Sequence, residues 1–139
     1  KTSEIRLQMQ KTMQAHCSVF RREDILAAGL SKMKDIHASL QDIALFDRSL
    51  IWNSDLMEAL ELENMMGQSL VSLASALARQ ESRGSHARDD YPKRDDQQWL
   101  KHTFSWVDDK ATIKLDYRPV HMFTLTDEVD VVPLQERVY

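Results

Sequence analysis

Three stretches of this chain repeat apolar residues at the three- and four-residue spacing of an α-helix, and this pattern constrains the fold more than any other feature. The first stretch begins at Ser3, whose hydroxyl suits a helix cap. Its apolar row is Ile5, Met9, Met13, His16, Cys17 and Phe20. The second covers about residues 22–44, and the third runs from a cap at Asn53 or Ser54 to about Ala78. Short connections between three such helices predict an up-down-up bundle of the spectrin-repeat kind.

After the third helix the period changes from helical to alternating. A short helix is expected near 97–102, and Thr103–Val107 and Thr112–Tyr117 then alternate apolar with polar residues, as a half-buried strand does. Asp108–Lys110 suits the turn between them. Because a lone hairpin is marginal in water, we expect it to pack on the helices. The remainder, 118–139, has two prolines and no sustained period, which predicts an extended tail.

These patterns predict a mainly α fold in a single domain. The three-helix bundle is assigned to 1–82, and a charged loop, short helix, β-hairpin and extended tail packed on it are assigned to 83–139. A length of 139 residues with 42% hydrophobic residues is sufficient for one core. The chain is in helical pattern almost from its first residue and lacks an initial methionine, so we expect it to be a piece of a longer protein.

Composition excludes several classes of partner and site. The net charge of -4 and the mixing of basic with acidic residues give no field for a nucleic acid. The single cysteine, Cys17, excludes an internal disulfide, and its place in an apolar row predicts a buried, inert thiol. No apolar run approaches the roughly 20 residues that span a bilayer, so we expect a soluble chain without direct membrane insertion.

The residues also give no sign of catalysis or of a cofactor within this chain. Gly29, Gly67 and Gly84 are too far apart to form a phosphate-binding loop. No two histidines have metal-ligand spacing on one helix, and no serine or cysteine has the partners of a nucleophile. We therefore expect no catalytic, cofactor-binding or metal-binding residue here.

The densest charge in the chain is the run Arg79–Pro92, directly after the third helix. One interpretation is a solvated loop with Gly84 as the helix C-cap, since nothing in the run resembles core and exposed ion pairs contribute only about 0–1 kcal/mol each. The other is a contact surface in which arginines hold carboxylates bidentately. Within the run, Arg83 and Arg88 flank His86 and disfavour its charged form, which suits binding an anion or a carboxylate of another domain, or is an accident of a polar loop.

The run and its surroundings closely resemble the C-terminal helical domain of the succinate dehydrogenase and fumarate reductase flavoprotein subunits. The matching segments keep the family's order along nearly the whole chain: Met9–Gln14, Val19–Arg21, Trp52–Leu62, Ala78–Tyr91, Trp99–Thr103 and Leu115–Val120. The tail Tyr117–Glu128 looks most like the succinate dehydrogenase branch of bacteria related to mitochondria.

This resemblance implies an activity for the parent subunit rather than for the chain alone. The parent would oxidise succinate to fumarate, pass a hydride to covalently attached FAD, and send electrons through an iron–sulfur subunit to quinone. The flavin-binding and capping domains, with the catalytic residues, would lie upstream. Membrane anchor subunits would hold the complex at the cytoplasmic face of a bacterial inner membrane, or at the matrix side in mitochondria. The C-terminal domain would form structure and interfaces, and alone it is expected to be inactive.

The resemblance also implies which residues make the contact with other domains or subunits. The candidates are Arg79, Glu81, Arg83, His86, Arg88 and Asp90. We expect the run to be mobile in this chain because its partners would be missing. Trp52, Asp55 and Glu58 would brace the start of the third helix or meet a neighbour.

Three alternatives stay open at the level of sequence. The chain could be the corresponding domain of a fumarate reductase, or of L-aspartate oxidase, which shares a Glu-Ser-Arg-Gly signature but is not expected to keep the Tyr-Arg-Pro-Val strand. It could also be a freestanding helical interaction module that shares only the bundle.

Overall fold

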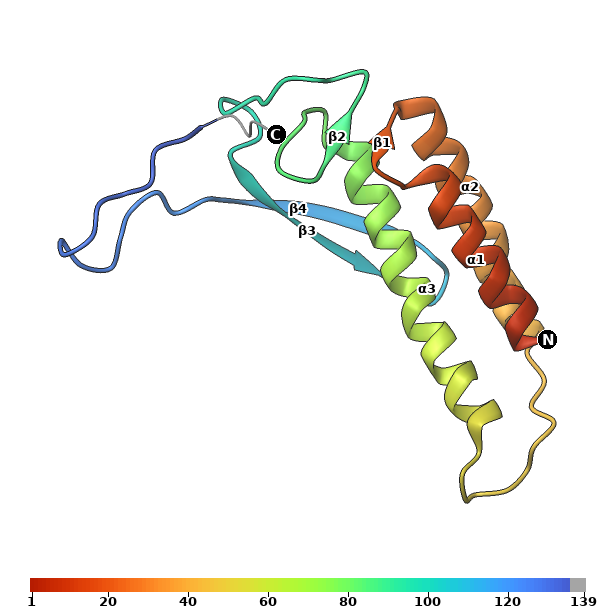
Figure 1. Ribbon diagram of the computed structural model, residues 1–139. Helices are drawn as coiled ribbons and strands as arrows, with labels where there is room; N and C mark the ends of the chain where they lie inside the picture. Colours follow the sequence, from red (N-terminus) through yellow and green to blue (C-terminus); the bar gives the residue numbers. More distant parts are fainter. Residues whose placement is uncertain (136–139) are drawn as a thin grey trace.

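The computed structural model describes residues 1–135 and is mainly helical, with a small antiparallel β-hairpin, as the sequence predicts. The helices are α1 (Thr2–His16), α2 (Glu23–Ala38), the short 3-10 helix η1 (Ser39–Asp42) and α3 (Ser54–Ala78). Helices α1, α2 and α3 lie side by side and contact one another in all three pairs (Figure 1). The last four positions of the predicted tail, 136–139, lie outside the described residues.

The core lies between these three helices. Its buried members are Ile5, Met9, Leu26, Met33, Ile36, Leu62, Met66, Leu70, Leu73 and Ala76, with Ala111 from the hairpin. Helices α1 and α2 approach closely at Gly29, where an added Cβ would lie 2.4 Å from the Cβ of His16. Phe20, predicted for the first apolar row, is 72% exposed, so this assignment is wrong. The reason is that α1 ends at His16 and Phe20 belongs to a strand.

The helix ends follow the sequence in one case and differ in two. Asn53 caps α3 as predicted, because its Oδ1 accepts the Leu56 amide at 2.9 Å. Helix α1 begins one residue earlier than the predicted cap at Ser3, and α2 ends at Ala38 rather than near residue 44. After η1, the chain to α3 is held by polar contacts, among them the Phe46 amide donating to Asp55 Oδ2 at 2.6 Å.

Two very short strands join the charged run to the end of α1. Strand β1 (Phe20–Arg21) pairs in parallel with β2 (Ala87–Arg88), with Arg21 opposite Arg88. Two-residue strands have no detectable alternation, so the sequence did not indicate them. Their pairing places Arg21 beside the charged run.

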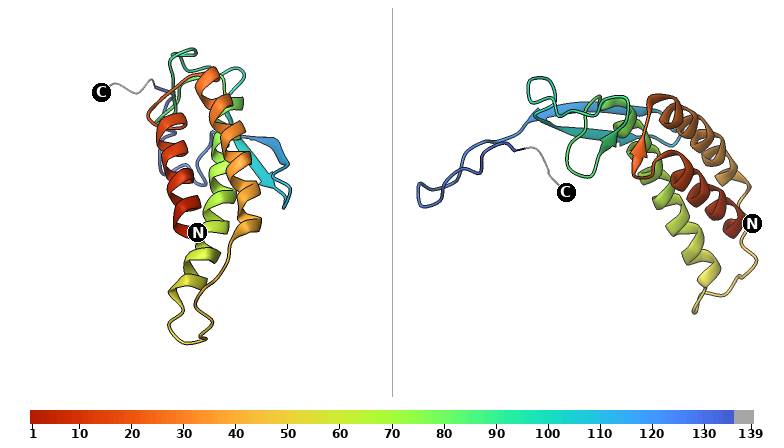
Figure 2. Two further views of the ribbon diagram at one scale, coloured as in Figure 1. Left: turned by 90° about the vertical axis from the view of Figure 1, so that its right-hand side faces the viewer. Right: turned by 45° about the horizontal axis from the view of Figure 1, so that its top comes forward.

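The predicted hairpin is present and slightly longer than expected. Strands β3 (Lys101–Val107) and β4 (Ile113–Pro119) pair antiparallel, from Lys101 opposite Pro119 to Val107 opposite Ile113. The turn lies where predicted, and Asp108 Oδ1 accepts the Thr112 amide at 2.8 Å. The predicted helix at 97–102 is wrong, because β3 already begins at Lys101. The hairpin contacts α3 through both strands and runs at an angle to it (Figure 2).

The tail leaves the hairpin at Val120 and projects away from the helices before turning back (Figure 1). Its return is fixed by Arg94, whose guanidinium donates to the carbonyl of Gln135. Within residues 1–135, no helix combines the length and apolar character needed to cross a bilayer. The division at 82/83 within a single domain stays a prediction.

Candidate functional site

Glu81 is the centre of a charge network built by the run. Its side chain is fully buried, and both carboxylate oxygens accept hydrogen bonds. Oε1 accepts from Arg79 at 2.5 Å and from Arg83 Nε at 2.8 Å, while Oε2 accepts from Arg83 at 3.0 Å and from the Asp95 amide at 2.9 Å. Burial by itself raises the pKa of Glu81, but the donors from Arg83, Asp95 and Arg79 outweigh it and hold the pKa below its ordinary value.

Arg88 forms the second half of the network, and it too is buried, at 1% exposed. Its Nε and Nη2 donate to the two oxygens of Asp90 at 2.7 and 2.8 Å, the bidentate geometry of a strong arginine–carboxylate pair. This hydrogen-bonded pairing places the pKa of Asp90 far below its ordinary value.

The Arg88–Asp90 pair joins the ends of two helices. Arg88 Nη1 donates to the carbonyls of Ala76 at 3.1 Å and Leu77 at 3.0 Å, which belong to the last turn of α3 and have no partner inside the helix. Asp90 Oδ2 accepts the amide of Glu23, the first residue of α2, at 2.8 Å. A cation at a helix C-terminus and an anion at an N-terminus both suit the helix dipoles. The pair therefore fixes the end of α3 against the start of α2.

A tight turn brings the two halves together. Arg83 and His86 exchange both backbone hydrogen bonds, at 2.9 and 3.0 Å, around Gly84 and Ser85. Gly84 has φ +58, a conformation that strains side-chain-bearing residues. Beyond the turn, Ser82 Oγ accepts the Arg88 amide at 2.9 Å. The run therefore folds back on itself and brings its charged side chains together.

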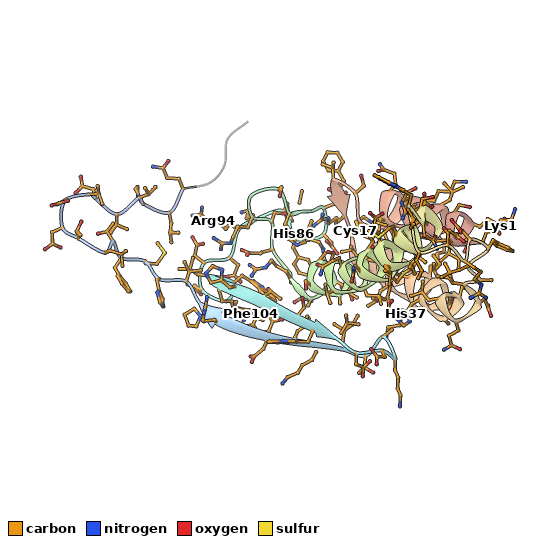
Figure 3. All side chains as sticks on the ribbon, turned by 90° about the horizontal axis from the view of Figure 1, so that it is seen from below. Lys1, Cys17, His37, His86, Arg94 and Phe104 are labelled. Carbon is orange, nitrogen blue, oxygen red and sulfur yellow. The ribbon has the colours of Figure 1, made fainter. Side chains whose placement is uncertain are left out.

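His86 lies between the network and the end of α1, near Cys17 (Figure 3). Its Nδ1 is 2.8 Å from Arg21 Nη1, and its Nε2 is 3.2 Å from the Arg79 carbonyl. Because a guanidinium only donates, Nδ1 accepts from Arg21 and Nε2 carries the proton. Burial, followed by the nearby Arg21, Arg88 and Arg79, lowers the pKa of His86. The imidazole is therefore held neutral between two fixed partners.

All six predicted contact residues come together in this network, but the environment predicted for the run is wrong. Glu81 and Arg88 are among the largest fully buried side chains of the described chain, so the run is not a solvated loop. Glu81, Asp90 and the three arginines of the run find partners within this chain, so partners from another domain are not required to pair them. Gly84 is not a helix C-cap, because α3 already ends at Ala78.

Sequence reasoning missed four members of the site. Arg21 contacts His86, and Asp96 accepts from Arg83 at 2.7 Å and from Arg94 at 3.1 Å. Trp99 lies 5.2 Å below the Arg79 guanidinium, and the Asp95 amide reaches Glu81. Only Arg21 and Trp99 had a signal, since Val19–Arg21 and Trp99–Thr103 are among the segments that resemble the flavoprotein family. Cys17, predicted to be buried, is only half-buried and lines the adjacent cavity, although burial still raises the pKa of its thiol.

The site holds charge in place. Its carboxylates are all engaged by guanidinium groups or amides. Gly29 and Gly67 lie inside helices and Gly84 in a tight turn, so the residues present do not fit the glycine-rich cradle of a dinucleotide such as FAD. In residues 1–135, no three side chains of His, Cys, Asp or Glu gather as a metal site would require.

Comparison with known families identifies the family of this chain. The profile of a family described as "Fumarate reductase flavoprotein C-term" matches residues 6–139. The chain belongs to this family. Within it, the chain is 54% identical over 137 residues to the succinate dehydrogenase flavoprotein subunit of Rickettsia conorii, covering 99% of the chain and 23% of that protein.

Two further proteins, from other organisms, also match most of this chain. The mitochondrial succinate dehydrogenase [ubiquinone] flavoprotein subunit of Oryza sativa is 49% identical over 139 residues, covering 99% of this chain and 22% of that protein. A solved structure of Escherichia coli quinol fumarate reductase superposes with a TM-score of 0.85 at 30% identity, covering 91% of this chain and 22% of that one. The chain thus spans less than a quarter of the length of these flavoproteins.

Proposed function

We propose that this chain is the C-terminal domain of a succinate dehydrogenase flavoprotein subunit, which as a whole oxidises succinate to fumarate. One observation carries the proposal: the chain is 54% identical, over 99% of its length, to a protein of that description. The solved fumarate reductase has a closely similar fold but only 30% identity, which favours the succinate dehydrogenase branch over fumarate reductase.

In the parent subunit, FAD would be held by the upstream flavin-binding and capping domains, because no residue set among the described residues 1–135 fits it. Electrons would pass to an iron–sulfur subunit and, through membrane anchor subunits, to quinone. The complex would lie at the cytoplasmic face of a bacterial inner membrane, or at the matrix side in mitochondria. The domain described here would contribute structure and interfaces, and none of its residues would touch the substrate.

The charged network would form the base of the contact with the rest of the flavoprotein. Glu81 and Arg88 are buried and would set the shape of that base rather than meet a partner directly. Arg79, Arg83 and His86 line a cavity beside the network and would face the partner. The support for this role is the cavity at the end of α3, which Arg79, Arg83 and His86 line while Glu81 and Arg88 are buried.

The test is the activity of the flavoprotein with and without its upstream part. The complete flavoprotein, purified with its iron–sulfur partner, should reduce a dye with succinate, and do so faster than it oxidises a reduced dye with fumarate. The 139-residue chain should show no succinate oxidation. Succinate oxidation by this chain alone, or a complete protein that oxidises L-aspartate instead, would contradict the proposal.

A further inference from the structure

A cavity of about 730 Å³ opens beside the network, between α3, β1, the charged run, β3 and the tail. Its wall includes four basic side chains, those of Arg21, Arg79, Arg83 and Lys101, and none of the described residues lining it carries a carboxylate. The chain as a whole has a net charge of -4, so this excess of positive charge is local.

The four basic groups are not equally satisfied. Glu81 lies behind the wall and pairs with Arg79 and Arg83, and Asp96 gives Arg83 a second carboxylate partner. Arg21, in contrast, has no carboxylate within 4 Å anywhere in residues 1–135. Lys101 likewise has no such partner there and lies over the rings of Trp99 and Tyr117, at 4.6 and 4.3 Å.

The guanidinium of Arg21 is fixed without being neutralised. It donates to the carbonyls of Ser18 at 2.9 Å and Cys17 at 3.4 Å, and to Nδ1 of His86 at 2.8 Å. A guanidinium has five N–H donors, so these contacts leave two of them for another ligand. Because His86 is neutral, its contact positions Arg21 but cancels none of its charge. A guanidinium held in this way is preorganised for a carboxylate, the ligand that matches its planar pair of donors.

We propose that this cavity is a carboxylate-binding recess in which the two free N–H groups of Arg21 hold one carboxylate, with Lys101 adding positive charge to the wall. The inference rests on the proposed function, because the expected source is an Asp or Glu side chain in the part of the flavoprotein that this chain lacks. A free carboxylate ion has the same chemistry and is the second source to be distinguished.

Chemical footprinting of the complete flavoprotein tests the recess. Phenylglyoxal modifies accessible guanidinium groups, and peptide mass spectrometry gives the rate at each arginine. Arg48 is the control, because its side chain is exposed and, unlike Arg22 with its partner Asp24, it has no carboxylate within 4 Å in residues 1–135. In buffer without carboxylates, Arg21 should react about tenfold or more slowly than Arg48 if a protein carboxylate holds it, since a bidentate charged pair is worth at least that factor.

The remaining outcomes distinguish a protein carboxylate from a free carboxylate ion, and both of these from a cavity that binds no carboxylate. Slow reaction of Arg21 only after acetate is added assigns the recess to a free carboxylate. Equal rates at Arg21 and Arg48 in both buffers overturn the recess. Since any cover would slow the reaction, a structure of the complete flavoprotein must also place carboxylate oxygens against the free nitrogens of Arg21, and uncharged groups there would overturn it. Normal succinate oxidation in the same preparation would show that the proposed function survives such a failure.

Discussion

At the scale of single residues, the charged run shows that a highly polar segment can still be buried. Glu81 and Arg88 belong to the most polar segment of the sequence, yet both are buried. Composition predicted a solvated loop because the partners that make burial possible are contributed by separate segments, among them the Asp95 amide and the carbonyls of Ala76 and Leu77. The resemblance to the flavoprotein family selected residues that gather in one network, and their contact with other domains stays a prediction.

Glu81 should be the most sensitive of these residues. Replacing it by Gln would leave two arginines without their shared carboxylate, and removing one partner of a buried ion pair costs about 3–5 kcal/mol. We expect Glu81→Gln to lower the free energy of unfolding in urea by about this amount. The control is Glu61→Gln, at an exposed pair with Arg6 that is worth about 1 kcal/mol or less. Equal effects of the two substitutions would show that the network is not buried in solution.

His86 should give the fold a pH dependence above the range of the carboxylates. Its pKa is lowered in the folded state, whereas an unfolded histidine titrates near about 6.5. Between these two values the unfolded state binds more protons, so stability is complete above about pH 6.5 and falls as the pH decreases below it. Glu81 and Asp90, whose pKa values are also lowered, contribute only below about pH 4.

The measurement is urea unfolding of the wild type and His86→Gln between about pH 7.5 and pH 5. Gln retains one acceptor for Arg21 and one donor for the Arg79 carbonyl, but does not titrate. The wild type should lose more stability than the variant over this range. Parallel curves would mean that His86 titrates alike in the folded and unfolded chain.

At the scale of elements, the length of each helix or strand determined whether the sequence could predict it. Helix α3 and the strands β3 and β4 were found because each repeats its period several times. Strands β1 and β2 were missed because two residues have no period. The end of α3 was placed correctly near Ala78, but its cap was assigned to Gly84. The carbonyls of Ala76 and Leu77 in the last turn of α3 instead accept hydrogen bonds from Arg88. Arg88 belongs to a later segment, and no local sequence signal indicates this contact.

The three glycines provide a test of element geometry, because each should respond differently to alanine. Gly84→Ala should cost about 1–2 kcal/mol, since φ +58 strains an L-residue although nothing lies within 4 Å. Gly67→Ala should stabilise α3 by up to about 1 kcal/mol, because its Cβ would meet only Val107, at 3.7 Å. Gly29→Ala should cost about 1–3 kcal/mol or more, because α1 and α2 would have to separate.

Thermal or urea unfolding of the three variants measures these signs directly. Gly67→Ala also serves as the control for the other two, since it makes the same chemical change without strain or overlap. A stabilising Gly29→Ala would contradict the close approach of α1 and α2, and a neutral Gly84→Ala would contradict the turn that folds the charged run.

At the scale of the whole molecule, apolar and charged surfaces left uncovered fit a domain that belongs to a larger protein. Leu50 and Trp52, between η1 and α3, are each 96% exposed, and Leu125 in the tail is 98% exposed. Exposed apolar residues gathered at defined places are typical of surfaces that meet other protein. Family membership was predictable from the ordered segments of the sequence, whereas the cationic cavity was not, because it is assembled from five separate parts of the chain.

We propose that the charged network supports the flavoprotein without taking part in its chemistry. The most direct test is Arg88→Met in the complete flavoprotein with its partners, because Arg88 is buried and binds two helix ends. The molecules that retain FAD should oxidise succinate with unchanged kcat and KM per flavin, while the midpoint of thermal unfolding falls. A large loss of kcat in molecules with full flavin content and unchanged thermal stability would contradict the claim and place this network in the catalytic machinery.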